Sequence, residues 1–117
     1  MKFNEVIGQE DVWARLMNMA KEERIPHALL FCGPKGCGKM AVALAFASYL
    51  MGENMEASDD SLLTDAERRT SAMLKKWEHP DLHFTYPTIK TSDMASDHKP
   101  ISDDFASQWR ELLAKGP

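Results

Sequence analysis

A glycine-rich octapeptide between two apolar runs constrains the fold of this chain more than any other feature. It follows the apolar run 28–32 and precedes the Ala-rich run 41–51. Glycine allows a tight turn with several N–H groups pointing inward, because no Cβ blocks the necessary dihedral angles. This order predicts a buried strand, a tight loop and a helix. The octapeptide reads Gly33-Pro34-Lys35-Gly36-Cys37-Gly38-Lys39-Met40.

The octapeptide matches the phosphate-binding loop pattern G-x-x-x-x-G-K-[ST] at every position except the last. Backbone N–H groups and the positive end of the following helix hold phosphate oxygens in such a loop, and Lys39 adds a full charge. Met40 stands where a hydroxyl binds magnesium, and a thioether is a poor ligand for a hard cation. We expect residues 33–40 to hold ATP or ADP with a weakened grip on magnesium. The alternative is a glycine turn with no ligand.

Composition bounds the remaining possibilities. The chain has 117 residues, enough for one small domain, with 44% hydrophobic and 27% charged residues and a net charge of −4. This charge argues against nucleic-acid binding over the whole surface, although a local basic patch is compatible with it. The sequence contains no apolar run of membrane-spanning length, and its polar start predicts no secretory signal. Cys32 directly precedes the loop and Cys37 lies within it, and we expect both to be reduced, as in a cytoplasmic protein.

Apolar periodicity and capping signals predict four helices and two strands. Helices are expected over 9–24, from near Gly38 to residue 51, from the capping-box residue Thr64 to before Pro80, and from Ser102 to before Gly116. Strands are expected over 28–32 and 82–86. Helices alternating with apolar strands predict an α/β fold with a partial parallel sheet and flanking helices.

Four segments, taken in order, resemble AAA+ ATPases of the clamp-loader clade, and in particular bacterial DNA polymerase III clamp-loader subunits. They are Phe3–Glu10, Arg24–Phe31, His79–Leu82 and the helical stretch beginning at Ile101. The resemblance implies the N-terminal portion of an AAA+ P-loop NTPase, with residues 1–117 ending before the acidic Walker B strand. It also implies that Ile7 and Gly8 contact the adenine side of the nucleotide.

Within that family the chain looks most like the delta-prime type, whose phosphate loops are often eroded as Met40 is here. The resemblance implies a DNA replication role as a subunit of the polymerase III holoenzyme, a nucleotidyltransferase assembly, with no catalytic residue in this chain. The implied partners are other clamp-loader subunits, the sliding clamp and, through the complex, primer-template DNA. An active P-loop ATPase of the gamma/tau or Holliday-junction motor type is the alternative.

Two departures from the family pattern lead to further expectations. The family's four-cysteine zinc module is absent, because residues 52–78 contain no cysteine, so we expect no zinc. The two expected strands are not neighbours in the family's sheet, and each would carry unpaired edges. We therefore expect either self-association through these edges or a packing of the strands that differs from the family's.

Overall fold

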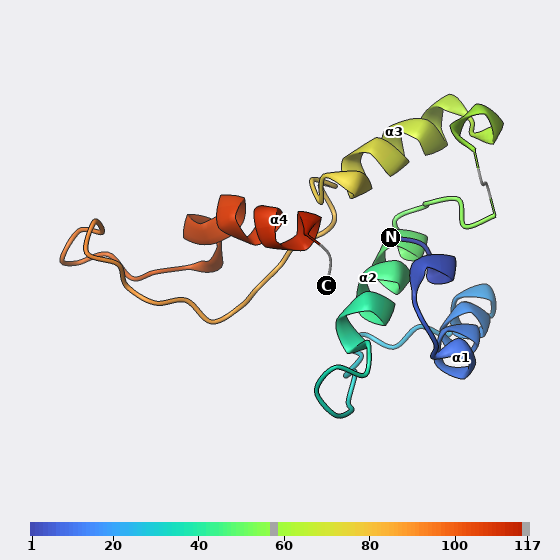
Figure 1. Ribbon diagram of the computed structural model, residues 1–117, viewed down its shortest axis with the longest axis horizontal. Helices are drawn as coiled ribbons and strands as arrows, with labels where there is room; N and C mark the ends of the chain where they lie inside the picture. Colours follow the sequence, from blue (N-terminus) through green and yellow to red (C-terminus); the bar gives the residue numbers. More distant parts are fainter. Residues whose placement is uncertain (57–58, 116–117) are drawn as a thin grey trace.

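The computed structural model of the chain describes residues 1–56 and 59–115, with only the backbone of Asp60, and every regular element in these ranges is helical (Figure 1). Helices form in all four predicted places, and three short 3₁₀ turns accompany them. The helices are α1 (Glu10–Lys21), α2 (Lys39–Leu50), α3 (Asp65–Lys75) and α4 (Ala106–Ala114), and the turns are η1 (Phe3–Glu5), η2 (Asp60–Leu62) and η3 (Ser102–Phe105).

The predicted α/β fold with a partial parallel sheet is wrong for this structure, because no strand occurs among the described residues. Segments 28–32 and 82–86 are irregular instead. No backbone group of residues 28–32 is hydrogen-bonded to a described residue, and Leu30 is 87% exposed. A helix makes its hydrogen bonds within itself, whereas a strand needs a neighbour to complete its ladder. Neither segment finds such a neighbour here.

Helix α2 is the centre of the packing, because opposite sides of it are buried against different elements. One side joins α1 and η1 in a cluster of buried residues, around which Trp13, Phe31 and Tyr49 pack. The rings of Phe3 and Trp13 stack with their centroids 5.5 Å apart. Figure 1 shows α1 and α2 side by side. The buried residues of this cluster are Phe3, Leu16, Val42, Ala45 and Phe46.

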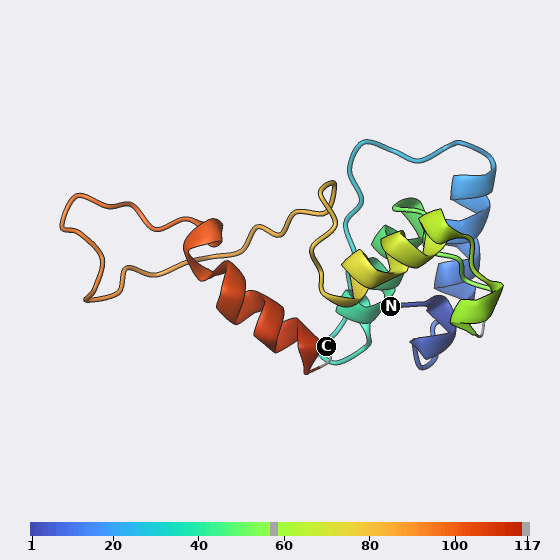
Figure 2. The same ribbon diagram turned by 90° about the horizontal axis from the view of Figure 1, so that it is seen from above.

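The other side of α2 buries Leu44 against Trp77 and Leu113, with Phe84 and Trp109 packed around them. Figures 1 and 2 together place α3 across the C-terminal end of α2, away from the glycine-rich loop. The burial of α2 on two sides explains why Ser48 is buried as well as the apolar residues of the helix. It also means that α2 is held firmly on both sides while the loop at its N-terminal end remains at the surface.

Segment 82–86 keeps the alternation of a strand without its hydrogen bonds. Leu82, Phe84 and Tyr86 are half-buried, while the residues between them are exposed. The ring of Tyr86 stacks on Trp109 at 4.7 Å, and its hydroxyl donates to the carbonyl oxygen of Ser102 at 2.7 Å. The alternation of burial persists without a sheet, because packing against α4 needs only one face of the segment.

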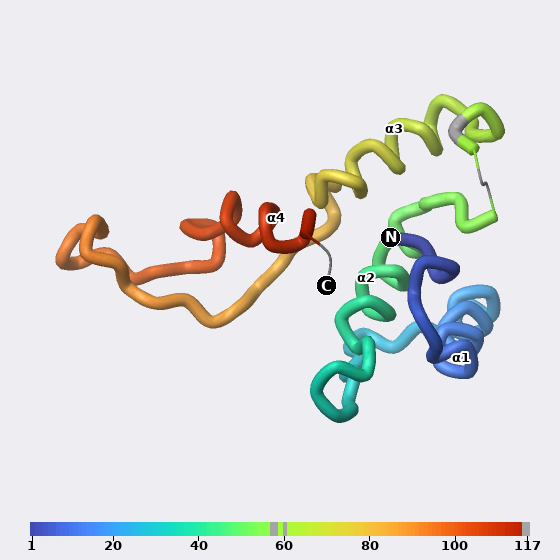
Figure 3. The backbone as a smooth tube through the Cα atoms, viewed as in Figure 1, coloured from blue at the N-terminus to red at the C-terminus, as the bar shows by residue number. Residues whose placement is uncertain are grey.

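An open loop beyond this segment makes the molecule extended (Figure 3). The radius of gyration is 16.3 Å, against about 13 Å for a compact domain of this length. Among the described residues, no helix has the length and apolar content needed to cross a membrane.

Candidate phosphate-binding loop

The glycine-rich loop leads directly into α2, as the sequence predicts. Gly36 has a φ angle of 83°, and Gly38, the residue that precedes α2, has a φ of 91°. Side chains other than glycine rarely adopt this left-handed region, so the two glycines allow the chain to turn into the helix without strain. Helix α2 begins at Lys39, in agreement with the predicted start near Gly38.

The N-terminal end of α2 has uncapped backbone N–H groups. No side chain caps it, and the first intrahelical acceptor bond runs from the N–H of Val42 to the carbonyl oxygen of Gly38 at 3.0 Å. The N–H groups of Lys39, Met40 and Ala41 have no acceptor among the described residues. The first turn also contains no acidic residue. Free donors and the positive end of the helix dipole together favour an anion at this position.

Lys39 folds back over the loop. Its Nζ donates to the carbonyl oxygens of Gly33 and Pro34, at 2.6 and 2.9 Å. An ammonium group has three N–H donors, so these two bonds leave one donor for another partner. The lysine charge therefore lies within the loop itself, next to the open end of the helix.

The loop is closed by contacts that hold Cys37 against Gly33. The N–H of Cys37 donates to the carbonyl oxygen of Pro34 at 3.3 Å. A Cβ atom at Gly33 would lie 2.7 Å from Sγ of Cys37, a separation that real Cβ atoms do not show. The side-chain amide of Gln9 donates to the carbonyl oxygen of Cys37 at 3.0 Å and so ties the loop to the start of α1. The sequence analysis missed Gln9, because a polar residue at a helix start carries no signal of a distant contact.

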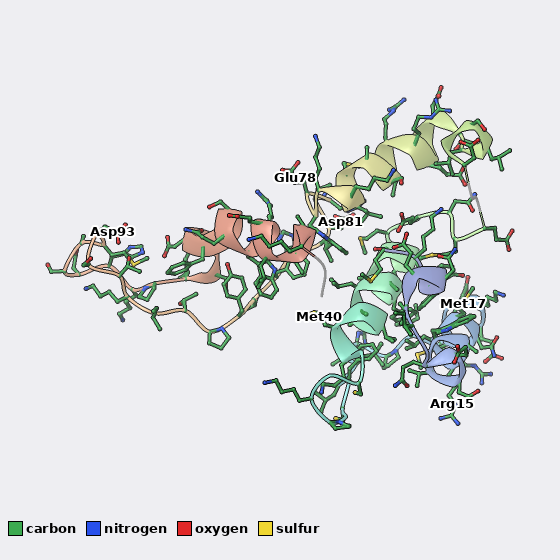
Figure 4. All side chains as sticks on the ribbon, in the orientation of Figure 1. Arg15, Met17, Met40, Glu78, Asp81 and Asp93 are labelled. Carbon is green, nitrogen blue, oxygen red and sulfur yellow. The ribbon has the colours of Figure 1, made fainter. Side chains whose placement is uncertain are left out.

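Met40 lies where the magnesium-binding hydroxyl of the pattern would lie, and it is 45% exposed. Figure 4 places it near the loop end of α2, on the opposite side of that helix from α1. It borders a hollow of about 350 Å³ together with Lys35, Gly36, Gly38 and Lys39. The thioether thus faces an accessible space beside the lysine, and it offers no oxygen ligand to a cation.

Ile7 and Gly8, the residues expected at the adenine side of the nucleotide, lie in different surroundings near the loop. Ile7 is 97% exposed and borders a second hollow, of about 390 Å³, with Gly36, Cys37 and Gly38. Gly8 has a φ of 75° and does not line that hollow. Ile7 therefore shares a hollow with the loop, and Gly8 directly precedes Gln9, whose side chain donates to the carbonyl oxygen of Cys37. Pro34 and Lys35 lie at its exposed tip.

Comparison with known proteins places the chain in a family. The family described as DNA polymerase III, delta subunit, matches residues 8–110. The replication factor C small subunit of Archaeoglobus fulgidus is 47% identical over 64 residues, which cover 49% of this chain and 20% of the relative. That of Methanosarcina mazei is 36% identical over 69 residues, which cover 59% of this chain and 20% of the relative.

The matched region thus spans about a fifth of the length of these curated relatives. No solved structure matches the chain. The family match runs from Gly8 to Arg110, which is most of the chain, and it includes the glycine-rich loop. The chain therefore belongs to the DNA polymerase III delta subunit family of clamp-loader AAA+ proteins.

Proposed function

We propose that the chain is the N-terminal part of a clamp-loader subunit of the delta-prime type that acts in cytoplasmic DNA replication. Its loop binds the phosphates of ATP or ADP without needing magnesium, and it does not hydrolyse the nucleotide. Other clamp-loader subunits and the sliding clamp are its partners, and primer-template DNA is reached through the complex. The family match and the replication factor C relatives support the replication role.

One arrangement carries the nucleotide part of the proposal. The free N–H groups at the start of α2 and the ammonium group of Lys39 lie together at the loop, while Met40 occupies the position of the metal-binding hydroxyl. The first two features attract an anion. The third removes a ligand through which magnesium would be held beside the phosphates. Anion binding and metal binding are therefore separable in this chain.

A titration of the chain with a fluorescent ATP analogue, in magnesium and in EDTA, tests this proposal. We expect weak binding whose affinity differs between the two conditions by less than about twofold, because the metal adds little to the contacts. Tight binding that requires magnesium would contradict the proposal and favour the active-ATPase alternative.

Substitution at Met40 sharpens the test. Met40→Thr supplies a hydroxyl and should make the affinity increase when magnesium is added, whereas Met40→Leu conserves the size of the side chain without an oxygen and should behave like the unaltered chain. ATP hydrolysis by Met40→Thr should stay at the level of the unaltered chain, because catalysis also needs a residue that positions the attacking water. A gain in hydrolysis would instead support an ATPase of the gamma/tau or Holliday-junction motor type.

Self-association remains a prediction of its own. The groups left without backbone partners in segment 28–32 are available for pairing with another chain. Light scattering over a range of protein concentrations tests whether the chain self-associates. A molar mass that stays at the monomer value throughout would rule out pairing through segment 28–32.

A further inference from the structure

Both cysteines of the chain border one hollow beside the phosphate-binding lysine. Cys32 is exposed, Cys37 is half-buried, and both are free thiols. The hollow measures about 350 Å³, and Gly33 and Lys39 line it as well. It lies at the same loop as the open end of α2. Both cysteines thus line the same space as Lys39.

The turn of the loop brings Cys37 against Gly33, the residue that follows Cys32. The hydrogen bond from the N–H of Cys37 to the carbonyl oxygen of Pro34 turns the chain back on itself. As a result Sγ of Cys37 lies against Gly33, where a Cβ would be only 2.7 Å away. Cys32 is the direct neighbour of Gly33 in the sequence. Bridged cysteines have Cα atoms about 4.4–6.8 Å apart, so a bond requires Cys32 to move toward the sulfur that lies against its neighbour Gly33.

Segment 28–32 is held by the packing of Phe31 against the cluster of α1 and α2 rather than by backbone hydrogen bonds. None of its backbone groups is hydrogen-bonded to a described residue. Cys37, in contrast, is held by hydrogen bonds with Gln9 and Pro34, and it directly precedes Gly38, the residue before α2. Cys32 can therefore approach Cys37 without breaking a backbone hydrogen bond.

We propose that Cys32 and Cys37 form a reversible disulfide that closes this hollow and lowers the affinity of the loop for phosphate. The oxidant is a low-molecular-weight disulfide. The thiolate of one cysteine attacks the oxidant, forms a mixed disulfide and releases one thiol; the second cysteine then attacks the protein sulfur of the mixed disulfide and releases the other. The pair loses two electrons and two protons, and the oxidant becomes two thiols. The effect on affinity, but not the disulfide itself, rests on the proposed nucleotide binding.

The new bond would act on the loop through Gly33. The carbonyl oxygen of this residue accepts the shorter of the two hydrogen bonds from Lys39. Drawing Cys32 toward Cys37 changes the path of the chain through Gly33 and narrows the hollow beside Lys39. Lys39 and the anion then compete with the bridged chain for the same space.

The experiment treats the chain with oxidised glutathione and follows it by intact mass, by N-ethylmaleimide labelling and by ATP-analogue binding in EDTA. We expect the mass to fall by two hydrogens, labelling to disappear, and the dissociation constant for the analogue to rise at least about tenfold. Dithiothreitol should reverse all three changes. The Cys32→Ser variant cannot complete the exchange and should accumulate as a mixed disulfide with glutathione at Cys37.

Several results would overturn the proposal. They are a mixed disulfide that persists in the unaltered chain, a covalent dimer on a non-reducing gel, and an internal disulfide that leaves analogue binding unchanged. If the reduced chain binds no analogue, the proposed nucleotide binding fails and the claimed effect on affinity fails with it. The mass and labelling measurements still decide, without any nucleotide, whether the disulfide forms.

Discussion

Helices α2 and α3 have nearly equal lengths, 12 and 11 residues, but their N-terminal ends are built in opposite ways. At α3, the hydroxyl of Thr64 accepts from the N–H of Glu67 at 3.3 Å, and the carboxylate of Glu67 accepts from the N–H of Thr64 at 2.8 Å. Asn54 donates to the other oxygen of the same carboxylate at 3.0 Å. At α2, no side chain performs either task.

The difference separates an end that stabilises the fold from an end that is available for binding. The capping box of α3 satisfies donors of the helix and places negative charge at the positive end of its dipole. Helix α2 leaves the same kinds of groups without acceptors and has the ammonium group of Lys39 nearby. An incoming anion would supply at α2 what Thr64 and Glu67 supply at α3. Substitutions at the two ends should therefore change different properties.

The largest effect is expected for Lys39→Ala. The variant loses a charge-assisted hydrogen bond to phosphate, worth about 1.5–3 kcal/mol, so ATP affinity should fall by about ten- to a hundredfold. The exposed Lys76, at the C-terminal end of α3, offers a matched control: Lys76→Ala also removes one positive charge and should leave affinity unchanged. Equal losses of ATP affinity in the two variants would show that only the net charge of the chain matters, and that the N-terminal end of α2 has no specific role in binding.

Gly33→Ala should have the next largest effect on binding. The new methyl group would lie 2.7 Å from Sγ of Cys37, so either this side chain or the loop must shift, at a cost of up to about 1–2 kcal/mol, part of which is lost from ATP affinity. Combining it with Cys37→Ala removes the sulfur and should recover most of the loss. A double-mutant cycle of ATP affinities measures this coupling. Additive effects would mean that the contact between residues 33 and 37 does not shape the loop.

The sequence predicts elements that are stabilised by local contacts better than elements that depend on distant partners. The helices were predicted where they form, because turns such as the Thr64–Glu67 capping box and apolar periodicity act within one segment. The two strands predicted at 28–32 and 82–86 do not form among the described residues, because the backbone partners of a strand must come from elsewhere in space. The loop residues were identified by spacing, but the contacts of Gln9 with Cys37 and of Cys37 with Gly33 depend on tertiary packing.

Thr64→Ala should affect stability rather than binding. Loss of the cap of α3 should lower the free energy of unfolding by about 1 kcal/mol, measured by urea denaturation. ATP affinity should not change, because α3 lies at the far end of α2 from the loop (Figure 1). Thr85→Ala removes the same atoms from an exposed position outside any helix and serves as the control. A change in ATP affinity with Thr64→Ala would show that the two helix ends are coupled through α2.

The smallest effect is a pH dependence of stability that arises at the α3 end. The N–H and hydroxyl of Thr64, and then the amide of Asn54, lower the pKa of Glu67 by donating to its carboxylate. A carboxyl group with a pKa lower in the folded state than in the unfolded state stabilises the fold above its unfolded pKa. This stabilisation is lost as the pH falls through the lowered value. Urea denaturation at a series of acidic pH values should therefore show a shallower decline for Glu67→Gln than for the unaltered chain, since a neutral amide keeps the shape of the cap but does not titrate. Identical slopes would mean that the α3 end is held by geometry alone, and that charge distinguishes only the open end at Lys39.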